Sequence, residues 1–149
     1  MQRVPAPPAD APRFERRERI RFSHCDPAGI VFYPQYYVLF NGLVEDWVCE
    51  GLGIPYAQLI GARRIGLPTV RVETDFRAIS RMGDEVVFGL QVERLGGHSI
   101  TLLMDCRGAD GALRVASRSV VVSTHLDTHR AVAVPDDLRA AIEAFQRRH

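Results

Sequence analysis

One long apolar helix constrains the fold of this chain more than any other feature. Residues 34–51 have the periodicity of a helix, and four large residues at spacings of four, three and four share one face: Tyr36, Phe40, Leu43 and Trp47. Tyr37, Val44 and Val48 widen this face well beyond an ordinary apolar stripe. A helix so apolar is buried over most of its circumference, so the rest of the chain must wrap around it.

The second half of the chain supplies the strands for this purpose. Alternation of apolar and polar residues predicts strands over residues 70–76, 86–92, 100–106 and 113–124, with Gly96-Gly97 as one hairpin turn. We also expect a partly exposed first strand within residues 14–24, a short return at 132–134 and a peripheral helix from Asp136. This order predicts an α+β domain in which one antiparallel sheet wraps around the long helix.

Composition limits the domain organisation and the classes of function. Residues 1–13 are rich in proline and alanine and are predicted to be a disordered tail, which leaves residues 14–149 as a single domain. The net charge of +1 argues against nucleic-acid binding, and no apolar run is long enough to cross a membrane. Three cysteines without CxxC spacing suit a reducing compartment, so a cytoplasmic location is expected.

A polar loop directly before the long helix is the main candidate for a reactive site. Asp26-Pro27 predicts a turn, Gly29 adds a flexible point, and Pro34 suits the first turn of a helix. A carboxylate therefore lies close to a helix N-terminus, whose free N–H groups favour negative charge. This arrangement is compatible with acyl transfer, but an aspartate here could also serve only to cap its own turn.

Other candidate chemistries are weaker. The chain has no lysine, which excludes Schiff-base and P-loop mechanisms. In an extended segment Cys25 would point away from the side of Asp26, so a small buried thiol is favoured over a Cys/His nucleophile that includes His24. The spacing of His125 and His129 would suit a metal pair on a helix, but at the end of a strand it favours a solvated turn. No metal site is predicted.

The order of elements and the segment Asp26-Pro27-Ala28-Gly29-Ile30-Val31-Phe32-Tyr33-Pro34 resemble the hotdog-fold acyl-CoA thioesterases, particularly the 4-hydroxybenzoyl-CoA thioesterase type. The resemblance implies hydrolysis of an acyl-CoA thioester to the free acid and coenzyme A. It implies that Asp26 acts as nucleophile or general base and that the backbone N–H of Tyr33 is the oxyanion donor. It also implies dimers or tetramers with sites at the dimer interface, and no cofactor besides the coenzyme A of the substrate.

The chain departs from that type at two places. The helix carboxylate that lies near the substrate ring corresponds here to Asn41, and the basic hairpin that binds coenzyme A phosphates corresponds to Gly96-Gly97-His98-Ser99. We expect an aromatic or medium-sized acyl group and the following substrate-binding residues: Pro34, Asn41, Arg94, Gly97, His98 and Ser99. The alternatives are a hotdog module that binds acyl-CoA without turnover, and a dehydratase, which would favour a histidine where Pro34 stands.

Overall fold

The computed structural model describes residues 3–148. The elements are, in chain order, β1 (Phe14–Arg19), a 3-10 turn (Phe22–His24), α1 (Tyr33–Asp46), a π-helical continuation (Trp47–Gly51), α2 (Tyr56–Gly61), β2 (Ile65–Gly66), β3 (Thr69–Phe76), β4 (Glu85–Leu95), β5 (Ser99–Gly108), β6 (Leu113–Val122), β7 (Thr124–His125), β8 (Arg130–Ala131) and α3 (Asp136–Gln146).

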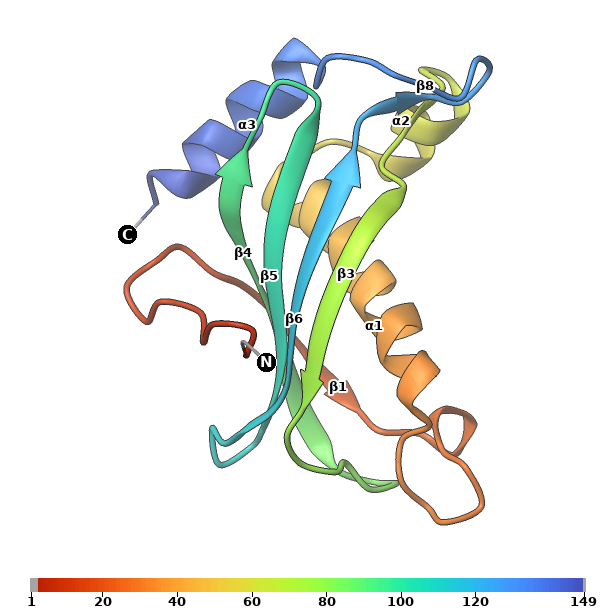
Figure 1. Cartoon of the computed structure of the whole chain (residues 1–149), viewed down its shortest axis with the longest axis vertical. Helices are drawn as coiled ribbons and strands as arrows, with labels where there is room; N and C mark the ends of the chain where they lie inside the picture. The colour runs from red at the N-terminus through yellow and green to blue at the C-terminus, as the bar shows by residue number, and fades with distance from the viewer. Residues whose placement is uncertain (1–2, 149) are drawn as a thin grey trace.

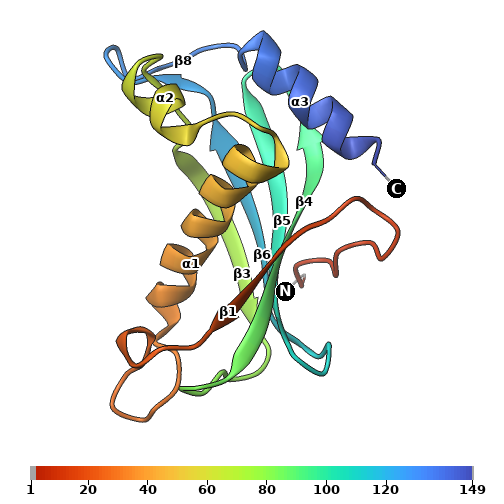
Figure 2. The same ribbon diagram turned by 180° about the vertical axis from the view of Figure 1, so that it is seen from behind.

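Five strands form one antiparallel sheet with the order β1-β4-β5-β6-β3, so that β3 is an edge strand. The helix α1 lies along one face of this curved sheet, while α3 and α2 lie toward the end where the hairpin of β4 and β5 turns (Figures 1 and 2). A small sheet, β2-β7-β8, lies beside α2. The predicted α+β architecture, an antiparallel sheet around one long helix, is confirmed.

The core lies between α1 and the sheet. The four residues that define the apolar face of the helix are all at most 3% exposed: Tyr36, Phe40, Leu43 and Trp47. Phe40 packs edge-on against Phe88 of β4 with ring centroids 5.5 Å apart, and Trp47 packs against Phe145 of α3 at 5.7 Å. Each fully buried large apolar side chain contributes roughly 1.5–3 kcal/mol, so this face fixes the helix on the sheet.

Two predicted strand segments differ from the structure. The first strand ends at Arg19, so the alternation at residues 20–22 is not part of it; Ile20 is nevertheless buried and donates its N–H to Asp84 O at 2.8 Å. Residues 132–134 form no strand, because their N–H groups bond elsewhere. Val132 donates to Ser123 O (2.8 Å) and Val134 donates to Gly97 O (3.0 Å).

Residues 3–13 form no helix or strand, but they lie over the outer face of the sheet, opposite α1. Val4 N–H donates to Asp75 Oδ2 at 2.7 Å, and the Gln91 side-chain amide donates to carbonyls in this segment. The guanidinium of Arg13 forms two 2.6 Å hydrogen bonds with the buried carboxylate of Asp105 and lies where a Cβ of residue 89 would be, so glycine is required there.

The prediction of a disordered tail over residues 1–13 therefore does not describe residues 3–13 of the structure. The physical reason is that their polar groups find partners on strands more than 70 positions away along the chain, which composition does not indicate. Residues 1–2 lie outside the described part of the chain.

Candidate active site

The candidate acid Asp26 lies in a loop that is closed by its own backbone hydrogen bonds. Cys25 and Val31 form an antiparallel bridge, Asp26 N–H donates to Ile30 O at 3.0 Å, and Gly29 N–H donates to Asp26 O at 2.9 Å. Gly29 has φ 77°, in the left-handed region that glycine adopts without a steric cost. The result is a short, well-defined turn that carries a half-buried carboxylate.

The carboxylate of Asp26 takes part in the turn and retains a further acceptor. Its Oδ1 accepts the N–H of Ala28 at 2.8 Å, the local bond typical of a turn aspartate. Within residues 3–148, Oδ2 accepts no hydrogen bond and is available to accept one from water. The capping role and a catalytic role are therefore compatible in one side chain.

The loop is docked against a second turn, residues 80–84, which precedes β4. Val31 N–H donates to Ser80 O and Met82 N–H donates to Gly29 O, both at 3.0 Å, and Ile30 forms a bridge with Arg81. Backbone hydrogen bonds on both of its arms therefore attach the loop to the sheet.

Tyr33 is the first residue of α1 and follows this loop directly. Pro34 has no N–H, and the N–H of Gln35 donates to Phe32 O at 2.8 Å. Among the described residues, the N–H of Tyr33 has no acceptor, so it is the free donor of the first three helix positions. Phe32 N–H donates to His24 O at 2.9 Å, which keeps the arms that carry Asp26 and Tyr33 side by side.

The residues that flank Asp26 do not form a Cys/His nucleophile. The thiol of Cys25 donates to Arg21 O at 3.4 Å, and burial, together with the charge of Asp26, raises the pKa of this thiol. His24 Nδ1 accepts the N–H of Arg21 at 2.9 Å, which ties the imidazole to its own turn. The structure thus agrees with the interpretation of Cys25 as a structural thiol, but the residue is half-buried and not fully buried.

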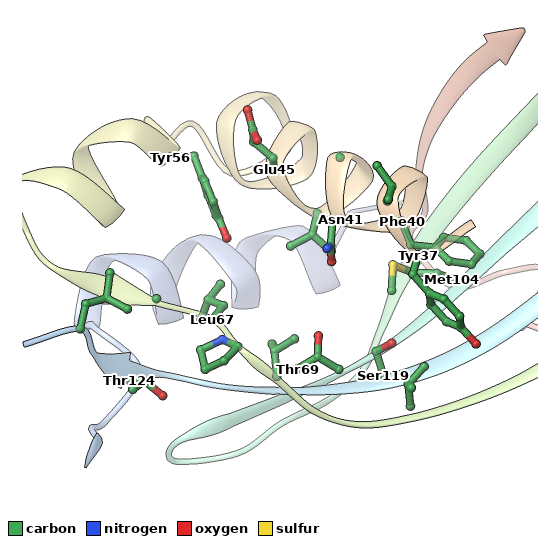
Figure 3. Close-up of a pocket in the computed structure, with 18 of the residues that line it drawn as sticks. Tyr37, Phe40, Asn41, Glu45, Tyr56, Leu67, Thr69, Met104, Ser119 and Thr124 are labelled. Carbon is green, nitrogen blue, oxygen red and sulfur yellow. The ribbon is translucent and has the colours of Figure 1, made fainter. Parts of the chain in front are cut away.

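A cavity of about 950 Å³ lies beside the C-terminal half of α1, a volume typical of sites for small ligands (Figure 3). Its apolar surface comes from α1, from the segment between β2 and β3, and from β5 and β6: Phe40, Val44, Leu67, Pro68, Met104 and Val121. Figure 3 shows the side chains of Asn41 and Tyr56 directed from α1 and α2 toward the strands. Burial, and then the charge of Glu45, raises the pKa of Tyr56, so its phenol remains a hydrogen-bond donor at neutral pH.

A row of side chains separates this cavity from the Asp26 loop within one chain. Tyr37 OH donates to Thr74 Oγ1 at 3.0 Å, and Thr74 shares a 3.0 Å hydrogen bond with Ser117. On the side of the loop, the ring of Phe76 lies 6.0 Å from that of Tyr33 and contacts that of Tyr36. Asp26 and Tyr33 do not line the cavity, whereas Asn41 does.

The predicted phosphate-binding residues lie at the opposite end of the sheet from Asp26. Gly97 and His98 form the turn between β4 and β5, Ser99 begins β5, and Arg94 lies near the end of β4 (Figure 1). The Asp26 loop contacts residues 80–84, just before β4 begins. The 11 residues of β4 span roughly 36 Å at about 3.3 Å per residue, so one chain does not bring the two sets together.

Sequence reasoning missed two groups of residues. Ser80 and its neighbours carry no motif that marks them as a support for the Asp26 loop. Tyr56 belongs to no motif either, and its place in the cavity depends on how α2 folds back over α1. No local pattern could have identified either group.

His125 is the last residue of β7 and His129 lies in the turn between β7 and β8, and His129 N–H donates to His125 O at 2.7 Å. In the described part of the chain, no three His, Cys, Asp or Glu side chains are grouped so that they could hold a metal ion. None of the helices between residues 3 and 148 has the length and apolar character needed to cross a membrane.

Comparison with protein families gives a match over most of the chain. The family model described as the thioesterase-like superfamily matches residues 20–142, a range that contains the Asp26 loop, α1 and the five-stranded sheet except for β1.

Three individual proteins are similar to this chain over most of its length, with sequence identities of 26–29%. A 1,4-dihydroxy-2-naphthoyl-CoA hydrolase from Synechococcus sp. (strain CC9605) is 29% identical over 144 residues, which cover 90% of this chain and 92% of the relative. A solved structure of a thioesterase superfamily protein from Jannaschia sp. CCS1 is 28% identical with a TM-score of 0.81, and covers 97% of this chain and 96% of its own. A gentisyl-coenzyme A thioesterase structure is 26% identical with a TM-score of 0.79, over 87% and 99%.

Proposed function

Because this chain belongs to the thioesterase-like superfamily, we propose that it hydrolyses an acyl-CoA thioester at the junction of the Asp26 loop and the N-terminus of α1. The observation that carries the proposal is the free N–H of Tyr33, the first residue of α1, on the arm beside the one that carries Asp26. An acid and an oriented amide donor are the two groups that this reaction requires.

Two chemical roles are proposed for Asp26, and both end in the same products. As a nucleophile, its carboxylate attacks the thioester carbonyl, the C–S bond breaks, coenzyme A leaves, and water hydrolyses the acyl-enzyme anhydride. As a general base, it takes a proton from the water that attacks the carbonyl. In both, the N–H of Tyr33 stabilises the negative oxygen, an interaction whose loss costs about 2.7–4 kcal/mol in other acyl-transfer enzymes.

We propose an aromatic acyl group with polar substituents, bound in the cavity beside α1. The cavity supports this with apolar walls and two polar side chains, Asn41 and Tyr56, directed toward the strands (Figure 3). The names of two relatives, 1,4-dihydroxy-2-naphthoyl-CoA hydrolase and gentisyl-coenzyme A thioesterase, specify aromatic acyl groups. The reaction needs no cofactor besides the coenzyme A of the substrate. The three free thiols suit a reducing, cytoplasmic setting.

We also propose that two copies form each site by antiparallel pairing of their β3 edges. Unpaired sheet edges and exposed apolar groups favour association, and Val70, Val72 and Phe76 of β3 are 43–62% exposed. The Asp26 loop lies at the Phe76 end of β3, because Tyr33 contacts Phe76, and the cavity reaches the Thr69 end. A two-fold axis at β3 therefore brings the loop of one copy toward the cavity of the other.

The same pairing accounts for the position of the predicted phosphate-binding turn. Gly97, His98 and Ser99 lie at the Thr69 end of the sheet, since Ser99 pairs with Val122 and Val122 N–H donates to Pro68 O. In the proposed dimer, this end of one copy lies alongside the Asp26 end of its partner. The coenzyme A phosphates would then contact the partner's turn and Arg94, and a tetramer would consist of two such dimers.

Release of free coenzyme A thiol from benzoyl-, hydroxybenzoyl-, naphthoyl- and straight-chain acyl-CoA tests this function. We expect turnover of the hydroxylated aromatic thioesters, and we expect Asp26→Asn to lower kcat by about 10²–10⁴-fold, as for other groups that act in proton transfer. Full activity of Asp26→Asn would contradict the assignment. Tight binding of acyl-CoA by the wild type without thiol release would identify a binding module instead of an enzyme.

A further inference from the structure

Ser80 connects the two parts of the proposed active site. It is 1% exposed, and its carbonyl accepts the N–H of Val31, on the arm of the Asp26 loop that leads into α1. Its hydroxyl accepts the OH of Tyr36 at 3.0 Å, from the first turn of α1. One buried residue is therefore hydrogen-bonded both to the loop and to the helix N-terminus that carries the Tyr33 amide.

The hydroxyl of Ser80 is itself held in place by an ion pair. Arg114 of β6 donates from Nη1 to Ser80 Oγ at 3.2 Å and to Asp84 Oδ2 at 2.7 Å. Asp84 Oδ2 also accepts the N–H of Arg81 at 2.9 Å, which closes the turn of residues 80–84. The turn is thus anchored to the start of β6 by a side chain distant from it in sequence.

We infer that Ser80 is a positioning residue for thioester hydrolysis, which fixes the Asp26 loop relative to the Tyr33 amide through its hydrogen bonds to Val31 and Tyr36. This inference rests on the proposed function. Ser80 itself does not touch the reacting atoms. Acyl transfer depends steeply on the placement of the acid and the oxyanion donor, and a shift of about 1 Å can lower the rate about 10²-fold.

The neighbouring tyrosine provides a matched control. Tyr37 OH donates to Thr74 Oγ1 at 3.0 Å, the same length as the bond from Tyr36 to Ser80. Both bonds join the start of α1 to a hydroxyl group, but Thr74 lies on β3, and within residues 3–148 its side chain hydrogen-bonds to Tyr37 and Ser117 and not to the Asp26 loop. Removing one bond or the other therefore separates a general loss of helix anchoring from a specific loss of loop placement.

The test compares Tyr36→Phe and Ser80→Ala with Thr74→Val by steady-state kinetics and thermal unfolding. For Tyr36→Phe and Ser80→Ala we expect kcat to fall about tenfold or more with KM changed less than about twofold. Thr74→Val should lower the melting temperature by a similar amount and leave kcat within about twofold; because its partner Tyr37 lines the cavity, any kinetic effect should fall on KM instead. Equal effects of Tyr36→Phe and Thr74→Val on kcat, or an unchanged kcat in Tyr36→Phe, would overturn the inference.

A second measurement keeps the two proposals distinguishable. Amide hydrogen exchange over residues 25–33 should accelerate in Tyr36→Phe and Ser80→Ala and stay at the wild-type rate in Thr74→Val. If the wild type released no thiol from any acyl-CoA, the proposed function would fail while this pattern could still be measured. Exchange unchanged in all three variants would overturn the positioning role even in an active enzyme.

Discussion

The two ends of α1 differ in what lies beside them: a hydrogen-bonded loop at the N-terminal end and a cavity along the C-terminal half. At the N-terminal end, hydrogen bonds to Ser80, to Gly29 and within the Asp26 loop hold every reactive group in place. Along the C-terminal half, Asn41, Gly42 and Glu45 remain exposed beside the cavity. In the proposed site, one chain therefore supplies the hydrogen-bonded loop with its reactive groups at one end of α1 and the open cavity at the other. The difference explains why the proposed site uses one end from each of two copies.

The strongest test of this comparison mixes two inactive variants. Asp26→Asn removes the acid, and Gly42→Phe fills the cavity from a position where a Cβ has no neighbour within 4 Å. Each alone should lose at least about 10²-fold in kcat/KM. Co-expressed with different tags, they should regain about a quarter of wild-type activity, because half of the dimers are mixed and one of two sites in each is intact.

The recovered activity should come from the dimers that contain one copy of each variant. Purification through both tags should raise the specific activity to about half that of the wild type, since every dimer then carries one intact site. Absence of recovery in a mixture that does form mixed dimers would place the acid and its cavity in the same chain. That result would refute the two-copy site.

A smaller change at the open end should alter binding without altering chemistry. Glycine within a helix is less stable than alanine by about 0.5–1 kcal/mol, and nothing lies within 4 Å of a Cβ at Gly42. We expect Gly42→Ala to stabilise the fold by about this amount and to raise KM for aromatic acyl-CoA several-fold, since the methyl group enters the cavity.

The matched control for that substitution is Gly61→Ala, at the end of α2. A Cβ there also has no neighbour within 4 Å, and Gly61 does not line the cavity. Gly61→Ala should therefore leave KM for aromatic acyl-CoA unchanged. If Gly42→Ala stabilises the protein and leaves KM unchanged for every acyl group, the acyl chain does not pass Gly42.

The smallest expected effect is the pH dependence of stability that comes from Asp84, in the turn that supports the Asp26 loop. The N–H of Arg81, and then the side chain of Arg114, lower the pKa of Asp84. A lowered folded-state pKa means that this carboxylate stabilises the fold fully above its unfolded value of about 3.9, and that the contribution is lost as pH falls through the folded value. The melting temperature should decrease between about pH 5 and pH 3, and Asp84→Asn should flatten this decrease.

An Asp84→Asn protein with the same acid dependence as the wild type would show that the turn of residues 80–84 contributes nothing to it. Asp137 offers a comparison at a distance from the site, because its pair with Arg63 also lowers its pKa. Asp137→Asn should change the acid dependence without changing hydrogen exchange in the Asp26 loop.

Sequence could predict the parts of the fold whose structure is determined by residues close together along the chain. The buried face of α1 follows from residues three and four positions apart, and β4 and β5 follow from apolar residues at every second position. The loop at Asp26 follows from proline and glycine chemistry. The assignment of Tyr33 as oxyanion donor comes from a resemblance, to which the structure adds a physical detail, namely that Pro34 and Gln35 have no free N–H.

The parts that sequence could not predict depend on contacts between distant positions. Arg114 reaches Ser80 across 34 positions, and neither residue belongs to a pattern that marks it as special. The cavity exists because α2 brings Tyr56 over the same strands that Asn41 faces. The order of residues 3–13 depends on Arg13 meeting Asp105, whereas proline and alanine content alone favours disorder.

The contact of Arg13 with Gly89 and Asp105 constrains how this protein can change over evolutionary time. Any side chain at position 89 would displace the guanidinium and remove its two hydrogen bonds from the buried carboxylate of Asp105, which would keep only the longer 3.7 Å contact with Arg107. Loss of one partner of a buried ion pair costs up to about 3–5 kcal/mol, a large part of the stability of a domain this size. Positions 13, 89 and 105 therefore constrain one another, and a side chain at position 89 costs least where neutral residues have replaced both Arg13 and Asp105.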